Sequence, residues 1–174
     1  MLLRPEGNHG PLARSLESYA EYYARYLLPW ERQALTRARP VAGDPDLAAA
    51  FMLLADGVAY RDPFPEADAR EIRKVKARVE RERIPPGEDP QLHLKLGKGG
   101  LVDVEFTAQL LQLMYGGSDK TVRIPGTVEA LDALRVAGAL SDDDCLALIE
   151  AYRFCERARN ARYLLTGRAV DSLP

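Results

Sequence analysis

The chain of 174 residues is poor in cysteine and histidine and has no long apolar run. Its two cysteines, Cys145 and Cys155, fall in one predicted helix, about 15 Å of helical rise apart, so they cannot bridge each other. Free thiols indicate a reducing compartment. His9 and His93 lack the spacing of zinc ligands, and no metal site is expected.

No segment approaches the roughly 20 apolar residues that cross a bilayer, and the N-terminal MLLRPEGNHG lacks a signal-peptide core. We therefore expect a cytoplasmic protein without membrane contacts. Neither GxSxG nor HExxH occurs, so the chain offers no self-sufficient catalytic constellation and no catalytic residue is assigned.

The chain also has no large excess of positive or negative charge, because 24 basic residues nearly balance 26 acidic ones. The basic run over residues 70–83 is interrupted by glutamates, and no aromatic residue lies between Phe64 and Phe106. Single-stranded nucleic acid binding combines positive charge with stacking aromatics. We interpret the run as a solvated helix face and expect no nucleic acid partner.

What the sequence does contain is helical periodicity, which predicts an all-α, irregular bundle of about six helices. Residues 15–39 carry aromatics at helical spacing, and Pro29 should kink or split that element. Asp44 and Pro45 open a helix that reaches about Tyr60. The further predicted helices cover residues 69–83, 101–115 and 127–140, and a last one that begins after Ser141 and ends at Gly167.

Breaks and caps complete this prediction. The stretch IPPGEDP, residues 84–90, is expected to be a linker, and LHLKL, residues 92–96, could be extended. Thr127 is expected to cap its helix, and Ser141 with Asp144 forms a capping-box pattern. The helix over 101–115 is apolar on several faces and should lie at the centre of the bundle.

The glycine-rich segment Lys95–Gly100 precedes a predicted helix N-terminus, where an anion is favoured. Two interpretations stay open. Lys95 and Lys98 could face a phosphate, or the segment could be a connector in which nearby carboxylates occupy the helix N-terminus. The segment does not match a phosphate-binding P-loop, and Asp103 would compete for the same positive potential, which favours the connector.

Polar residues form a stripe on the central helix. Glu105, Gln109 and Gln112 recur at spacings of four and three, whereas Asp103 lies about 200° of rotation from Glu105. The two carboxylates therefore do not share a face and are a poor pair for a metal. A structural anchor for Glu105 is favoured over a general base.

Glu31, Gln33, Arg37 and Arg39 are expected near the end of the first long helix, with both arginines in its last turn. They could simply compensate the helix dipole. Alternatively, the arginines could hold phosphate through their planar guanidinium groups. The residues alone leave these alternatives equally open.

Several short motifs in a fixed order resemble the glutamine synthetase adenylyltransferase family. They are LRPEG followed by GPL, WERQAL with RAR, GD, the segment KLGKGGLVDVEF, AYRF, and RN, found at residues 3–12, 30–39, 43–44, 95–106, 151–154 and 159–160. The likeness covers nearly the whole chain. The ending RNARYLLTGRAVDSLP looks more like the C-terminal, adenylylating half of that family.

This resemblance implies a helical domain that follows a nucleotidyltransferase head. Residues 1–14 would be the exit segment from the head, and residues 15–174 the helical domain, continuing beyond Pro174 in the longer protein. In the intact enzyme, head aspartates would hold magnesium, and ATP would donate AMP to a tyrosine of glutamine synthetase. Because those aspartates would precede Met1, this fragment alone is expected to be inactive and to bind no cofactor.

The resemblance also assigns roles and partners. Arg4, Arg37 and Arg39 would face the cleft beside the head, with Lys95 and Lys98 as further phosphate-facing candidates. The structural signature would comprise Glu31, Gln33, Gly99, Gly100, Asp103, Glu105 and Gln109, with Glu105 paired to an arginine. Partners would be the head, glutamine synthetase and the regulatory PII protein, with glutamine as effector.

Two alternatives stay open. The domain could be a non-catalytic interaction module that relays PII and glutamine signals, or the helical domain of a related PII uridylyltransferase.

Overall fold

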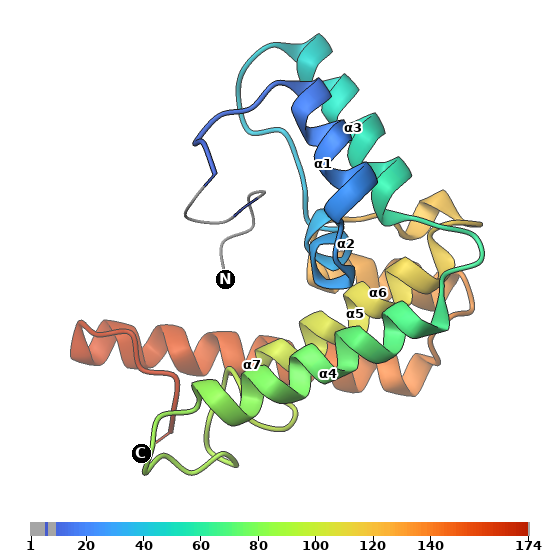
Figure 1. Cartoon of the computed structure of the whole chain (residues 1–174). Helices are drawn as coiled ribbons and strands as arrows, with labels where there is room; N and C mark the ends of the chain where they lie inside the picture. The colour runs from blue at the N-terminus through green and yellow to red at the C-terminus, as the bar shows by residue number, and fades with distance from the viewer. Residues whose placement is uncertain (1–5, 7–9, 174) are drawn as a thin grey trace.

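The computed structural model describes residue 6 and residues 10–173, which fold into seven α-helices and one 3-10 turn (Figure 1). Seven helices occur where about six were expected, because Pro29 splits the first predicted helix in two. The elements are α1 (Leu16–Tyr26), α2 (Pro29–Leu35), α3 (Pro45–Ala59), α4 (Glu66–Arg83), α5 (Leu101–Tyr115), η2 (Lys120–Val122), α6 (Thr127–Val136) and α7 (Asp142–Thr166).

Local signals set several helix ends. The side chains of Ser15, Asp44 and Ser141 each accept a hydrogen bond from a backbone amide in the first turn of the following helix. Pro45 occupies the first position of α3, where its missing amide costs nothing. Gly167 ends α7 in the left-handed conformation, with φ 65°. The all-α prediction is confirmed, as are the predicted caps Asp44 and Ser141 and the helix end at Gly167.

Several predicted helix ends were wrong: α4 begins at Glu66 and not at residue 69, and α6 ends at Val136 and not at residue 140. Helix α2 stops at Leu35, so Arg37 and Arg39 lie beyond it and do not occupy its last turn. The Thr36 hydroxyl donates to the Gln33 carbonyl over 2.7 Å. This bond satisfies a carbonyl at the end of the helix by a side chain instead of a further backbone amide. Thr127 is the first residue of α6, and Gly126 is the N-cap.

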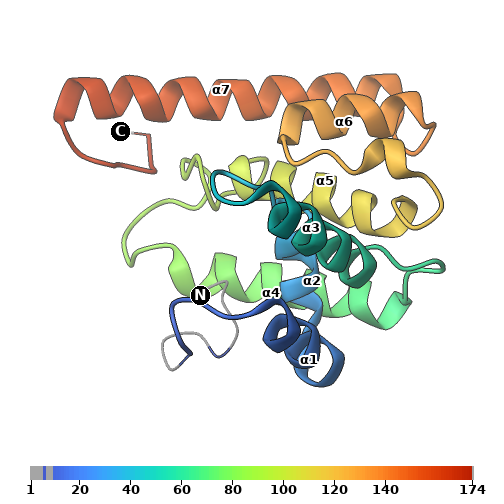
Figure 2. The ribbon, with the colours of Figure 1, turned by 90° about the horizontal axis from the view of Figure 1, so that it is seen from above.

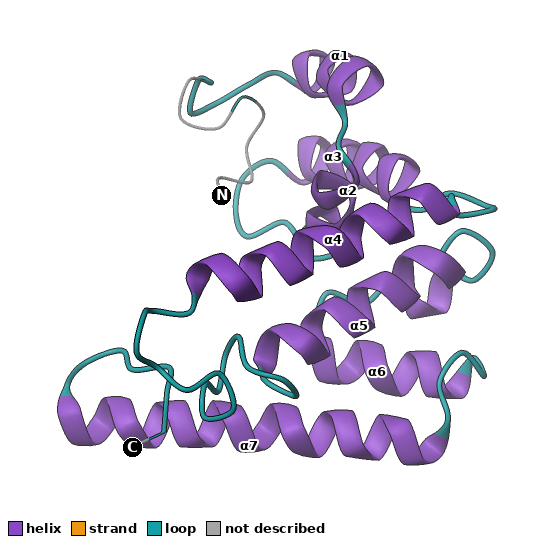
Figure 3. Cartoon of the chain, turned by 60° about the horizontal axis from the view of Figure 1, so that its bottom comes forward, coloured by secondary structure: helices purple, strands orange, loops and turns teal. Residues whose placement is uncertain are grey.

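The LHLKL segment is not an extended strand. Its only ladder contact among the described residues is an isolated bridge between His93 and Ser172. The Nδ1 atom of His93 accepts from the amides of Lys95 (3.3 Å) and Leu96 (3.0 Å), which curls the chain into a turn. Figure 3 shows this part as loop between α4 and α5.

Helix α5 is the centre of the bundle, as its apolar faces predicted. It packs against α2, α4, α6 and α7, while α1 and α3 pair with each other and α3 contacts α2 (Figures 1 and 3). Figure 2 shows that α6 lies along only the N-terminal half of α7. Within residues 6 and 10–173, no helix combines the length and apolar character needed to cross a bilayer.

The core has a main cluster on each side of α5. The cluster toward α3 and α4 contains Ala59, Tyr60, Ile72 and Leu113, and the cluster toward α6 and α7 contains Val104, Ala108, Leu131 and Cys145. Cys145 and Cys155 are both free and buried, as expected. Burial raises the pKa of each thiol, which disfavours the reactive thiolate.

Candidate functional site

The WERQAL motif builds the junction of α1 and α2. Glu31 is buried and accepts from the Leu28 amide (2.9 Å) and from the Tyr22 hydroxyl (2.8 Å). The first bond caps the start of α2, and the second ties α1 to it. Glu31 therefore has a structural role in this arrangement.

The neighbouring Arg32 is a key residue that sequence reasoning passed over. It is only 3% exposed, donates to the Val58 carbonyl and lies 3.4 Å from the Asp68 carboxylate. It thereby joins α2 to α3 and α4. Burial lowers the pKa of Arg32 and outweighs the attraction of Asp68, although a guanidinium stays charged at neutral pH. Its neighbours in the sequence, Glu31 and Gln33, are polar, so no local signal marked Arg32 as buried.

Two buried glutamines fix α5 to its surroundings. Gln33 donates to Gln109 over 2.8 Å, which links α2 to α5 across 76 positions of sequence. Gln112 donates to the carbonyls of Val122 (2.8 Å) and Ile124 (2.7 Å) and so holds the connection before α6. The polar stripe predicted on α5 thus faces other elements of the protein.

Arg37 and Glu105 form the arginine–carboxylate pair predicted for this helix. The Arg37 Nη1 atom lies 3.4 Å from Glu105 Oε1 and donates to the Thr127 hydroxyl over 3.2 Å. Tyr152 donates to the same Glu105 oxygen over 3.4 Å. The side chain of Arg37 remains 43% exposed. Part of the Arg37 side chain therefore stays accessible to solvent although it is paired with Glu105.

The turn before α5 requires glycine at positions where the backbone is crowded. A Cβ atom on Gly97 would collide with the Pro90 carbonyl and stand 2.5 Å from the His93 carbonyl, and one on Gly100 would stand 2.8 Å from the Leu94 carbonyl. Gly97 was not among the predicted signature residues. Its signal was the close spacing of glycines, which implies close backbone approach.

Asp103 occupies the helix N-terminus that a phosphate could have used. Its Oδ2 atom accepts from the Gly99 amide over 2.8 Å, and its other oxygen pairs with Lys76, which also pairs with Glu80. Gly99 has φ 76°, which favours glycine. The geometry agrees with the connector interpretation of this segment. Burial would raise the pKa of Asp103, but the bonds from Lys76 and Gly99 outweigh it and keep the pKa below its ordinary value.

This lowered pKa makes a testable contribution to stability. A carboxylate whose pKa is lower in the folded state stabilises the fold above its unfolded pKa and loses that effect as the pH falls through the folded value. We expect the wild-type protein to lose more stability than Asp103→Asn as the pH falls below about 4. Urea midpoints measured across this range would show it. Asp46→Asn, at an exposed site, is the control, and equal losses in wild type and Asp103→Asn would contradict the prediction.

Four of the predicted site residues meet in one groove between α2, α4 and α5. The groove has a volume of about 420 Å³, within the range of small-molecule sites. Its lining residues are Trp30, Gln33, Ala34, Arg37, Val75, Val79, Arg83, Lys95, Leu96, Val102, Phe106 and Gln109. Among these described residues there is no aspartate or glutamate, while Arg37, Arg83 and Lys95 are cationic. The groove therefore favours an anion above an apolar floor.

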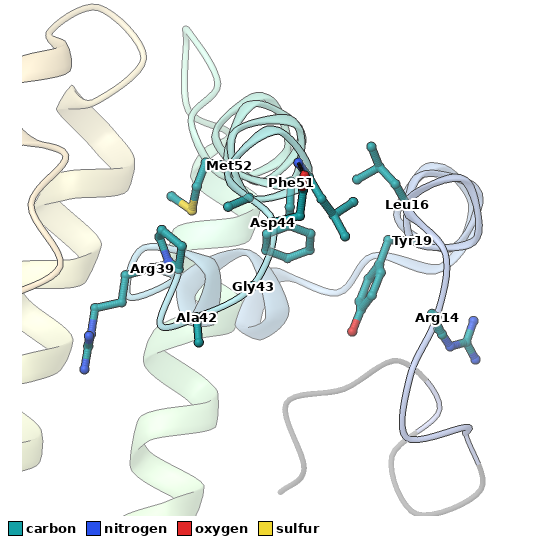
Figure 4. Close-up of a pocket in the computed structure, with 12 residues that line it drawn as sticks. Arg14, Leu16, Tyr19, Arg39, Ala42, Gly43, Asp44, Phe51 and Met52 are labelled. Atoms are coloured by element: carbon teal, nitrogen blue, oxygen red, sulfur yellow. Dashed lines mark hydrogen bonds between the residues drawn. The ribbon is translucent and has the colours of Figure 1, made fainter.

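The other predicted cations lie elsewhere. Arg39 lines a separate hollow of about 320 Å³ between α1 and α3. Figure 4 shows Arg14 and Arg39 at opposite ends of it, pointing away from the pair Tyr19 and Phe51, whose rings are 5.4 Å apart. Lys98 is exposed on the glycine turn. Arg4 lies outside the described residues.

Metal ligands are not gathered in the described part of the chain. Within it, no three histidine, cysteine, aspartate or glutamate side chains lie close enough to hold an ion together.

Two family models match different parts of the chain. The model described as glutamate-ammonia ligase adenylyltransferase matches residues 1–53, and the one described as GlnD PII-uridylyltransferase matches residues 69–174. The two matches together span most of the chain. The adenylyltransferase and the uridylyltransferase, the two enzyme types that the sequence left open, are thus both among the matches.

Curated relatives match along almost the entire chain. They are proteins named bifunctional glutamine synthetase adenylyltransferase/adenylyl-removing enzyme. The protein from Mycobacterium leprae is 49% identical over 173 residues, covering 99% of this chain and 17% of the relative. The one from Bifidobacterium longum (strain DJO10A) is 50% identical over 176 residues, covering 99% and 16%. The chain thus spans about a sixth of the length of the relatives it matches.

Proposed function

Since the chain belongs to the glutamine synthetase adenylyltransferase family, we propose that it is the helical part of an enzyme that transfers AMP from ATP to a tyrosine of glutamine synthetase. The identity of about half the residues along 99% of the chain supports this assignment. The resemblance of the C-terminal motifs points to the adenylylating half. In this proposal residues 1–14 connect to the nucleotidyltransferase head, which supplies the magnesium-binding aspartates.

The groove between α2, α4 and α5 is the proposed contribution of this domain to the reaction. Arg37 and Lys95, which the resemblance predicts to face phosphate, come from distant segments and line the same groove. The residues that line this groove include no aspartate or glutamate. That convergence is the observation on which the proposal rests. When ATP and magnesium are bound to the intact enzyme, they supply the activated phosphate. The cations of this chain would then balance phosphate charge.

Arg37 has the best geometry for this role. Glu105 and Thr127 hold its guanidinium from one side, which orients the group, and 43% of the side chain stays exposed. A preorganised donor costs little reorganisation when a ligand arrives. Arg4, Arg39 and Lys98 remain further phosphate-facing candidates of the proposal.

A chimera tests this role. The matching 173 residues of the Mycolicibacterium smegmatis relative, 48% identical, would be replaced by this chain. We expect the chimera to attach AMP to glutamine synthetase and Arg37→Ala to lower kcat/KM about tenfold, through loss of one charged phosphate contact worth about 1.4 kcal/mol. AMP removal, the reaction of the other half, should stay unchanged.

The matched control is Arg73→Ala, an exposed arginine of α4 that does not line the groove. Unfolding curves of both variants separate a lost contact from a lost fold. If Arg37→Ala were as active as the parent chimera, the phosphate-facing role would be refuted. The isolated chain, given ATP and magnesium, is expected to transfer no AMP.

The match of residues 69–174 to the uridylyltransferase model favours a second candidate, the helical domain of a PII uridylyltransferase. The two candidates differ in the protein that they modify and in the nucleotide that they use. Restored transfer of UMP to PII when this chain replaces the helical domain of a PII uridylyltransferase, together with an inactive first chimera, would favour the second candidate.

A further inference from the structure

His93 lies in the turn that brings Lys95 to the groove between α2, α4 and α5. Its side chain is only 3% exposed, and its Nδ1 atom accepts hydrogen bonds from the amides of Lys95 (3.3 Å) and Leu96 (3.0 Å). Both of these residues line the groove. The imidazole thus ties the backbone of two groove residues to a buried side chain.

These two bonds determine which nitrogen of His93 carries the proton. A neutral imidazole has one N–H donor and one acceptor, and an atom that accepts from amides cannot carry a proton itself. His93 is therefore neutral in this arrangement, with its proton on Nε2. Asparagine, aspartate, serine and threonine commonly accept from amides two or three residues further on. None of them changes its charge near neutral pH, whereas histidine does.

The charged groups beside the imidazole act in opposite directions. Those that line the cavity next to His93 are Arg83, Glu88, Lys95 and Asp171. The Glu88 carboxylate lies 3.8 Å from Nε2, beyond hydrogen-bond distance, and would favour an imidazolium. The two cations disfavour it, and the Asp171 carboxylate is already paired with Arg159 over 2.6 Å. Protonation of His93 would therefore gain Glu88 as a partner, but it would remove the acceptor of two backbone amides.

We propose that His93 is a positioning residue that holds Lys95 at the groove while its imidazole is neutral, and that protonation at Nδ1 releases this turn. A protonated Nδ1 is a donor, so it would direct a proton at two amide N–H groups. The two bonds must then break, wherever the imidazolium turns. The effect on catalysis rests on the proposed function, in which Lys95 faces phosphate, but the release of the turn does not.

Nitrogen-15 NMR of the 174-residue chain tests the protonation state. At about pH 7.5 we expect the His93 ring to carry its proton on Nε2 and none on Nδ1, and at about pH 5.5 we expect both nitrogens to be protonated. His9 is the only other histidine of the sequence, so the spectrum of His93→Asn assigns the signals. A proton on Nδ1 at about pH 7.5 would overturn the proposal.

Amide hydrogen exchange tests the release of the turn. Between about pH 7.5 and pH 5.5 we expect the Lys95 and Leu96 amides to lose about tenfold or more of their protection, measured against an unstructured peptide at each pH. The Gly116 amide, which donates to the Gln112 carbonyl over 2.7 Å at the end of α5, should keep its protection. Unchanged protection at Lys95 and Leu96 would contradict the proposal, as would an equal loss at Gly116.

Substitutions of His93 separate the loss of the acceptor from a general loss of structure. His93→Asn supplies an acceptor that does not titrate, so the two amides should stay protected at both pH values. His93→Ala removes the acceptor, so they should be unprotected at both. His9→Asn is the matched control and should behave as the wild type. A pH dependence in His93→Asn as large as in the wild type would assign the release to another group and overturn the proposal, even if His93→Ala does not fold.

The chimera with the Mycolicibacterium smegmatis relative tests whether the release reaches the groove. We expect the kcat/KM for AMP attachment, divided by that of the His93→Asn chimera, to fall about three- to tenfold from about pH 7.5 to pH 5.5. The ratio cancels pH effects that both chimeras share. A constant ratio with released amides would refute the role of Lys95 in the proposed function and leave the release standing. A constant ratio with protected amides would overturn the inference itself.

Discussion

Replacing Leu131 with alanine is expected to lower the free energy of unfolding by about 3–5 kcal/mol. Leu131 is fully buried in α6, where it packs with Val104 and Ala108 of α5 and Cys145 of α7. Three helices surround the site, so none can move in to fill the space without losing contacts of its own. The cost therefore includes both the lost transfer free energy and a persistent cavity.

Urea unfolding followed by far-ultraviolet circular dichroism measures this loss, at one protein concentration so that association does not contribute. The control is Leu53→Ala, since Leu53 is helical like Leu131 but 78% exposed. A change within about 0.5 kcal/mol is expected for the control. A comparably small loss for Leu131→Ala would mean that α5, α6 and α7 do not pack as described.

Arg32→Met is expected to destabilise the protein by about 2–4 kcal/mol. Methionine keeps much of the apolar volume but removes the bond to the Val58 carbonyl and the ion pair with Asp68. The Val58 carbonyl and Asp68 would lose these contacts while the site stays largely closed. The Asp68 side chain is 22% exposed, so water can hydrate its carboxylate after the substitution. The expected loss of stability is therefore smaller than the largest losses known for buried ion pairs.

The matched control is Arg70→Met, which removes another arginine–carboxylate pair of similar chemistry. Arg70 and Glu66 pair over 2.6 Å on α4 but are 66% and 76% exposed. Exposed pairs of this kind contribute at most about 1 kcal/mol. We expect the urea midpoint of Arg32→Met to lie clearly below that of Arg70→Met. Similar midpoints would show that Arg32 is not a structural link between α2, α3 and α4.

Several of the predicted signature residues have a structural role. Glu31 caps α2, Gln33 reaches Gln109, and Asp103 holds the Gly99 amide. Sequence reasoning found these positions because the motifs marked them, but it could not give their partners. The Gln33 and Gln109 side chains meet only after α2 has packed on α5. Arg32 was missed because a buried arginine looks the same in sequence as a solvated one.

The sequence by itself determined the helical class, most helix limits and the family likeness. Capping bonds and helical periodicity act within about four residues, so Asp44 and Ser141 could be interpreted without any tertiary information. Only the tertiary structure decided which cations share a surface. Arg37 and Lys95, far apart in sequence, line one groove, whereas Arg39, two residues from Arg37, lines another hollow. That outcome depends on how α2 and α4 pack on α5, which no local pattern encodes.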